Sequence, residues 1–152
     1  FFFMSDMGWM VGAMCACIPS YFGGSLLVAE GTPDFPDSGR FWRLLQDHKV
    51  TYLGVAPTLI RGLMRYGDTE VEQFDLSSLR ITVSGGEAWT EAPWRWFFDH
   101  VCKRRLPFLN IVGVPLTTAV PTSIVLAMPR ARPSGAGVPQ AAALAAASST
   151  AR

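Results

Sequence analysis

The chain has 152 residues, enough for one domain of ordinary size, and 49% of them are hydrophobic, enough for a buried core. Its net charge of +1 excludes a strong general attraction to nucleic acid or to an anionic membrane surface. The three cysteines, Cys15, Cys17 and Cys102, fit a reducing compartment better than a disulfide framework, and their spacing does not match that of a zinc site.

Residues 1–29 are strongly apolar, which raises the question of a membrane span. Asp6, several glycines and Pro19 interrupt the run, so no clean stretch of about 20 apolar residues remains. The buried interior of a soluble α/β protein is therefore the favoured interpretation, and membrane association is the weaker alternative. Phe1 is neither an initiator methionine nor the start of a signal peptide, so the sequence is typical of a piece of a longer protein.

Apolar runs and helical patterns alternate from residue 1 to residue 112. Strands are expected over residues 1–3, 25–29, 49–55, 79–83 and 107–112. Helices are expected over residues 10–22, 39–48, 56–66 and 92–103. Ser5 or Asp6 can cap the first helix, and residues 68–78 are expected to form a polar connection. This order predicts an α/β fold in which a parallel sheet is flanked by helices.

The segment 83–89 is the first candidate for a binding site. Gly85, Gly86 and Glu87 follow an apolar run, and a helix pattern with Pro93 in its first turn comes next. In a sheet flanked by helices, such a loop lies at the carboxyl end of a strand, where ligands bind. Taken alone, two adjacent glycines mark an ordinary turn more often than a nucleotide site, so the loop needs support from other segments.

The composition changes abruptly after Gly113. Residues 114–152 contain no acidic and no aromatic residue, and they are rich in alanine and proline. An Ala-rich helix over residues 140–147 would have no apolar face with which to dock and would be marginal. The tail is therefore predicted to be disordered.

Several segments, taken together and in order, resemble the AMP-forming acyl-CoA synthetases, in particular the acetyl-CoA and acetoacetyl-CoA synthetase-like branch of the adenylate-forming superfamily. They are Ser5–Met10, His48–Thr51 with Ala56–Arg61, Asp75–Arg80, Ser84–Trp89 and Trp94–His100. The resemblance covers residues 1–113. It implies that these residues are part of the large N-terminal AMP-binding (adenylation) domain, and it leaves residues 114–152 as a tail that is disordered or read from a shifted frame.

The resemblance also implies the site residues, position by position. Gly86, Glu87 and Ala88 match the Gly-Glu-Pro loop that holds the adenine and ribose of ATP or of the acyl-adenylate in this family. Ala88 replaces the usual proline, which removes some rigidity but no ligand-binding side chain. Positions that line the acyl pocket match Trp9, Met10, Val11 and Gly85. A glycine at position 85 leaves room for an acyl group larger than acetate.

Other family motifs are not found in this sequence. The phosphate loop with its lysine, and the small C-terminal domain with the catalytic lysine, have no counterpart. The Gly-Thr-Glu signature that serves phosphate and magnesium is replaced by Val114-Pro115-Leu116 after Gly113. A one-base shift of reading frame explains Val114 and Pro115 but not Leu116. No residue is therefore assigned to catalysis or to metal binding, and the chain is expected to be inactive alone.

The leading hypothesis is that the parent protein is a cytoplasmic enzyme that converts a carboxylate, ATP and CoA to acyl-CoA, AMP and pyrophosphate. ATP or AMP, CoA and Mg²⁺ are its implied ligands, with no nucleic-acid partner and no membrane span. The alternative is a truncated, non-catalytic remnant that binds nucleotide weakly or not at all. The acyl chain length stays open.

Overall fold

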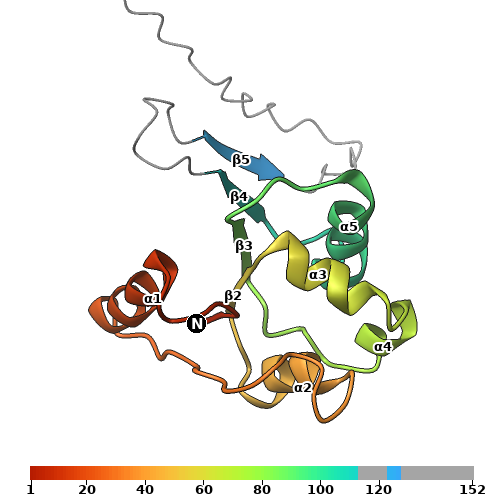
Figure 1. Ribbon diagram of the computed structural model, residues 1–152, viewed down its shortest axis with the longest axis horizontal. Helices are drawn as coiled ribbons and strands as arrows, with labels where there is room; N and C mark the ends of the chain where they lie inside the picture. The colour runs from red at the N-terminus through yellow and green to blue at the C-terminus, as the bar shows by residue number, and fades with distance from the viewer. Residues whose placement is uncertain (113–122, 128–152) are drawn as a thin grey trace, which may run out of the picture.

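The computed structural model describes residues 1–112 and 123–127, which form a five-stranded sheet with flanking helices (Figure 1). The strands are β1 (Phe2–Phe3), β2 (Tyr52–Val55), β3 (Ile81–Gly85), β4 (Phe108–Val112) and β5 (Ser123–Ala127). The helices are α1 (Met10–Tyr21), α2 (Arg40–Asp47), α3 (Pro57–Met64), α4 (Asp68–Glu72), α5 (Glu91–Trp96) and the π-helical turn η1 (Phe97–Val101). Strands β1 to β4 are parallel, and β5 pairs antiparallel with β4. The predicted α/β fold is confirmed.

The strands follow one another across the sheet in the order of the chain, from β1 to β5. Phe3 pairs with Gly54, Val55 with Ser84, and Gly85 with Ile111. Because β1 to β4 are parallel, the segments that leave their carboxyl ends begin at the same edge of the sheet. Helix α3 follows β2 at this edge, so its start lies beside the loop that follows β3.

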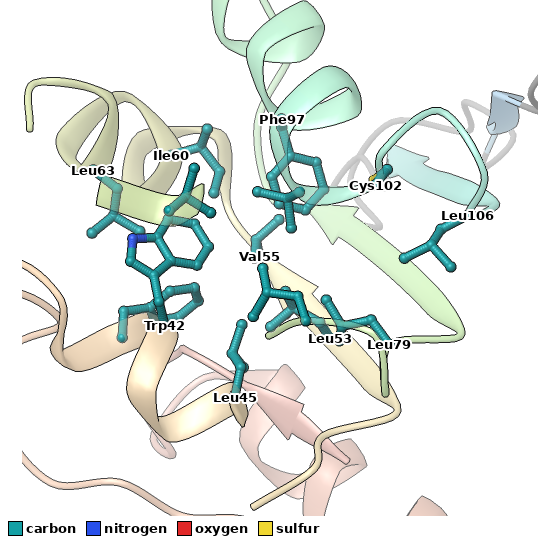
Figure 2. Close-up of a cluster of buried hydrophobic side chains, with 14 of the residues drawn as sticks. Trp42, Leu45, Leu53, Val55, Ile60, Leu63, Leu79, Phe97, Cys102 and Leu106 are labelled. Atoms are coloured by element: carbon teal, nitrogen blue, oxygen red, sulfur yellow. The ribbon is translucent and has the colours of Figure 1, made fainter. Parts of the chain in front are cut away.

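One face of the sheet carries the hydrophobic core. Residues paired across parallel strands share a face, so Leu53, Thr82 and Phe108 lie together on it. Helices α2 to α5 and the turn η1 pack their buried apolar side chains against this face (Figure 2). They include Phe41, Trp42, Leu45, Ile60, Leu63, Val71, Trp96, Phe97, Val101 and Cys102. Each large side chain buried in this way contributes about 1.5–3 kcal/mol of transfer free energy.

Helix α1 differs from the other helices. Figure 1 places it at the β1 end of the sheet, apart from α3, α4 and α5. Its buried residues are Gly12, Cys15 and Pro19, and none of them belongs to the main core. The helix begins at Met10, as expected, but the predicted cap is wrong: Trp9 is the N-cap residue, and the Asp6 carboxylate accepts a hydrogen bond from the Gly8 amide at 2.6 Å. Asp6 therefore closes a turn ahead of the helix.

Two further expectations are corrected. The strand predicted over residues 25–29 is reduced to a single bridge between Phe2 and Leu27, because β1 is only two residues long. The segment 68–78 was expected to be a polar connection, but its first residues form α4, which packs against η1. The burial of Val71, 1% exposed, supplies the tertiary contact that stabilises so short a helix.

The ends of the strands also differ from the prediction. The strand expected over residues 79–83 begins and ends two residues later, at Ile81 and Gly85, because its pairing with β4 continues to Gly85. Strand β5 falls in the tail that was expected to be disordered, so that prediction is wrong for residues 123–127. Their Ile-Val-Leu run has high β propensity, and the open edge of β4 gives it a partner. The rest of the tail lies outside the described residues.

The membrane question can be addressed for the described part of the chain. No helix within residues 1–112 or 123–127 has both the length and the apolar character needed to cross a bilayer. Helix α1, which lies within the apolar run of residues 1–29, has 12 residues and contains Pro19.

Candidate functional site

The candidate site is the loop over residues 86–90, between β3 and α5, which we call the glycine loop. It leaves β3 at the carboxyl edge of the sheet. Gly86 has φ = +94°, a backbone conformation that residues with a side chain rarely adopt. Gly86 and Ala88 are exposed. The loop thus turns sharply out of the sheet and presents its backbone to solvent.

Glu87 is attached to the first turn of α3. Its Oε1 accepts a hydrogen bond from the Thr58 amide at 2.7 Å and another from the Thr58 hydroxyl. Its Oε2 accepts a hydrogen bond from Nη2 of Arg61 at 2.6 Å, and the same nitrogen donates to the Thr58 hydroxyl at 2.7 Å. The Glu87 carboxylate, the Thr58 hydroxyl and the Arg61 guanidinium are therefore each hydrogen-bonded to the other two.

The network favours the ionised form of Glu87. Hydrogen bonds from Thr58 first, and from Arg61 second, hold the pKa of the Glu87 carboxyl below its usual value. The side chains of Arg61 and Glu87 are 40% and 35% exposed, so solvent screens their attraction. Glu87 carries a full negative charge at neutral pH, and that charge faces the positive end of a helix.

Trp89 holds the other end of the glycine loop. Its indole Nε1 donates a hydrogen bond to the Ser84 hydroxyl at 2.9 Å, and Ser84 is fully buried. The indole ring packs edge-on against Phe108 at 5.3 Å and tilted against Phe97 at 6.0 Å. The loop is therefore fixed to the core on one side of Ala88 and to α3 on the other.

Asn110 on β4 lies next to Ser84 in the sheet, on the core face. Its Oδ1 is buried, and no donor among the described residues reaches it. A buried acceptor without a donor costs about 1–3 kcal/mol, so this atom marks a polar position near the start of the glycine loop. Asn110 cannot be found from the sequence as a site residue, because a lone asparagine in an apolar strand forms no recognisable pattern.

The residues expected to line an acyl pocket are not brought together. Trp9 and Met10 lie at the start of α1 and are 72% and 78% exposed. Val11 follows on the same helix, whereas Gly85 is the last residue of β3, and Figure 1 shows α1 and β3 apart. A side chain at position 85 would approach the carbonyl oxygen of Ile111 to 3.3 Å. The acyl-pocket assignment of these residues stays a prediction.

A hollow of about 460 Å³ lies elsewhere. It is lined by β1, by the turn that follows it, by Cys15 of α1, and by residues 26–29 with Gly31. No residue of the glycine loop lines it. Within the described ranges, no cluster of three or more His, Cys, Asp or Glu side chains could hold a metal ion.

A solved structure and a protein-family model both match this chain. The acetoacetyl-CoA synthetase from Streptomyces lividans superposes with a TM-score of 0.67 at 20% sequence identity, over 76% of this chain and 18% of that one. This likeness supports the fold. The family model for the AMP-binding enzyme family matches residues 1–145, so the match continues past residue 113, and the domain boundary expected there stays a prediction.

Curated relatives agree with the family match. The acetyl-coenzyme A synthetase of Pasteurella multocida is 40% identical over 111 residues, which cover 72% of this chain and 17% of that protein. The acetyl-coenzyme A synthetase of Burkholderia lata is 36% identical over 146 residues, covering 85% of this chain and 22% of that protein. The chain thus matches about a fifth of the length of these relatives. On this evidence, the chain belongs to the AMP-binding enzyme family.

Proposed function

We propose that this chain forms the adenine- and ribose-binding part of an AMP-forming acyl-CoA synthetase. The parent enzyme converts a carboxylate, ATP and CoA to acyl-CoA, AMP and pyrophosphate. The observation that carries the proposal is the glycine loop: exposed backbone at the carboxyl edge of a parallel sheet, held between two side-chain anchors. Such backbone can pair with a purine edge and needs little rearrangement to do so.

The nucleotide is assigned to Gly86, Glu87 and Ala88, and the acyl group to Trp9, Met10, Val11 and Gly85. The names of the relatives favour acetate or a slightly larger carboxylate. Magnesium accompanies ATP in the parent enzyme, but the described residues show no cluster that fits it, and none is assigned to it. The odd number of cysteines favours the reducing cytoplasm as the location.

The 152-residue chain alone is proposed to bind nucleotide without forming acyl-CoA, since its sequence contains no counterpart of the lysine motifs that the resemblance implies. Incubation with acetate, ATP, Mg²⁺ and CoA should release no pyrophosphate above the rate without enzyme. Acyl-CoA formation by this chain would overturn the proposal that the reaction needs other parts of the parent protein.

Titration with AMP, followed by amide chemical shifts, tests the nucleotide assignment. We expect the amide signals of residues 86–88 to shift with saturation. Gly86→Ala should weaken binding, because a side chain at φ = +94° strains the loop by about 1–2 kcal/mol. Gly67→Ala is the matched control: Gly67 has φ = +88° but belongs to a turn before α4. No AMP-dependent shift at the loop, or equal weakening by both variants, would contradict the proposal.

A further inference from the structure

The contacts of Glu87 indicate that its side chain does not bind the ligand directly. We propose that Thr58 and Arg61 are positioning residues of the glycine loop, which hold Glu87 as an anchor so that the loop meets the nucleotide through its backbone. The identity of the ligand rests on the proposed function. The anchor itself rests only on the contacts between α3 and the loop.

Both carboxylate oxygens of Glu87 already have partners. Oε1 accepts two hydrogen bonds from Thr58, and Oε2 accepts one from Arg61 at 2.6 Å. These hydrogen bonds occupy three of the roughly four acceptor positions of the carboxylate. The bond from Arg61 is charge-assisted, the strong class of such interactions, and it fixes the orientation of the carboxylate toward α3. The side chain is thus better suited to hold the loop than to bind a sugar.

Helix α3 needs a partner of this kind. Its N-cap residue is Ala56, which has no side-chain acceptor, and Pro57 at the first helical position has no amide hydrogen. The Thr58 amide is the first free donor of the helix, and no side chain within the helix caps it. The Glu87 carboxylate supplies the missing acceptor from 29 residues away. Its negative charge also lies at the positive end of the helix dipole.

Trp89 is the second anchor of the glycine loop, and together with Glu87 it restricts the conformation of the loop. Trp89 ties the loop to the buried Ser84 hydroxyl at 2.9 Å, only two residues after Glu87. Ala88 lies between the two anchors and Gly86 precedes them, and both residues are exposed. With both anchors in place, few conformations are open to residues 86–88. Loss of the Glu87 anchor would leave this backbone held only at Trp89.

Amide hydrogen exchange of the 152-residue chain tests the anchor without any ligand. In Arg61→Gln and in Glu87→Gln, we expect the amide of Thr58, which donates to the Glu87 carboxylate, to exchange about fivefold faster, the effect expected for a loss near 1 kcal/mol. Arg95→Gln is the matched control, because Arg95 pairs with Glu91 on α5 rather than with Glu87. Exchange in Arg61→Gln and Glu87→Gln equal to that of the wild type would overturn the proposal.

Conservative substitutions separate positioning from general support of the fold. Thr58→Ser keeps the hydroxyl and the amide, so exchange of the amide at position 58 should stay at the wild-type rate. Thr58→Val keeps the amide and the side-chain shape but removes the hydroxyl, and exchange of the amide at position 58 should rise while exchange in β2 does not. Equal rates in both variants, or a rise that spreads through the sheet, would show that Thr58 does not act through Glu87.

Titration with AMP then distinguishes an anchor from a ligand. If Glu87 acts only by holding the loop, Glu87→Gln, Arg61→Gln and Thr58→Val should weaken AMP binding by similar factors. A loss in Glu87→Gln more than tenfold greater than in the other two variants would make Glu87 a direct ligand and would refute the anchor role. If the wild type binds no AMP, the proposed function fails, while the exchange experiment still decides whether the anchor exists.

Discussion

At the scale of single residues, the charge of Glu87 gives the stability of the chain a defined pH dependence. Its pKa is lowered in the folded chain from the ordinary value of 4.5, because Thr58 and Arg61 donate to the carboxylate. A lowered pKa means that the contribution is fully present above pH 4.5 and is lost as the pH falls through the folded pKa. The wild type should therefore be more stable than Glu87→Gln at pH 7, by up to about 1 kcal/mol, and the gap should close in strong acid.

Urea unfolding of both chains at pH 7 and below pH 4.5 measures this gap. Glu91→Gln serves as the control, because Glu91 pairs with Arg95 on its own helix and both side chains are well exposed. A gap between wild type and Glu87→Gln that stays constant over this pH range would contradict the assignment of the effect to the Glu87 carboxylate.

The hydrogen bond between Trp89 and Ser84 gives a second prediction at this scale. Trp89→Phe keeps an aromatic ring against Phe97 and Phe108 but leaves the buried Ser84 hydroxyl without its donor. We expect a loss of about 1–3 kcal/mol in the free energy of unfolding. Ser84→Ala added to Trp89→Phe should cost less than it does in the wild type, since the unpaired hydroxyl is removed. Additive losses would mean that the two side chains do not interact.

At the scale of elements, the Asp68 carboxylate connects α4 to α5. Asp68 accepts a hydrogen bond from the indole Nε1 of Trp96 at 2.6 Å, and Trp96 is 8% exposed. Asp68→Ala should cost about 1–2 kcal/mol of unfolding free energy and should raise amide exchange in α4, because a buried indole loses its acceptor. Asp68→Asn keeps an acceptor oxygen and should recover most of the loss. Exchange in α4 unchanged by Asp68→Ala would show that the hydrogen bond from Trp96 does not stabilise the helix.

The same scale separates what sequence patterns predict from what they do not. Helices α1, α2 and α3 begin and end within about three residues of their predicted bounds, because apolar spacing and Pro57 act locally. Helix α4 was missed, since it has too few residues for a period and is stabilised by contacts with η1. Strand β5 was missed because it forms by pairing with β4, and the composition of residues 123–127 does not reveal that partner. The contacts of Glu87 with Thr58 and Arg61 bridge 29 and 26 residues, which no local pattern encodes.

At the scale of the whole molecule, the apolar side chains divide into two groups. Those of α2 to α5 are buried against one face of the sheet, whereas α1 and its ends expose many of theirs. The exposed set comprises Trp9, Met10, Met14, Ile18, Tyr21 and Phe22. The apolar sequence of residues 1–29 was interpreted as a buried interior, and most of these side chains are instead on the surface of the described part. An apolar surface of this kind favours association in water.

Self-association of the 152-residue chain is therefore expected as its concentration rises. A net charge of +1 gives little electrostatic repulsion between copies of the chain. Replacement of both Tyr21 and Phe22, which are 85% and 79% exposed, by lysine should shift the chain toward monomer without loss of helix content. Phe35→Lys is the matched control, because Phe35 is 72% exposed but lies in a loop away from α1. Light scattering after size-exclusion chromatography measures the mass at several concentrations. A wild-type chain that stays monomeric throughout, or an equal effect of Phe35→Lys, would show that the surface of α1 does not drive association.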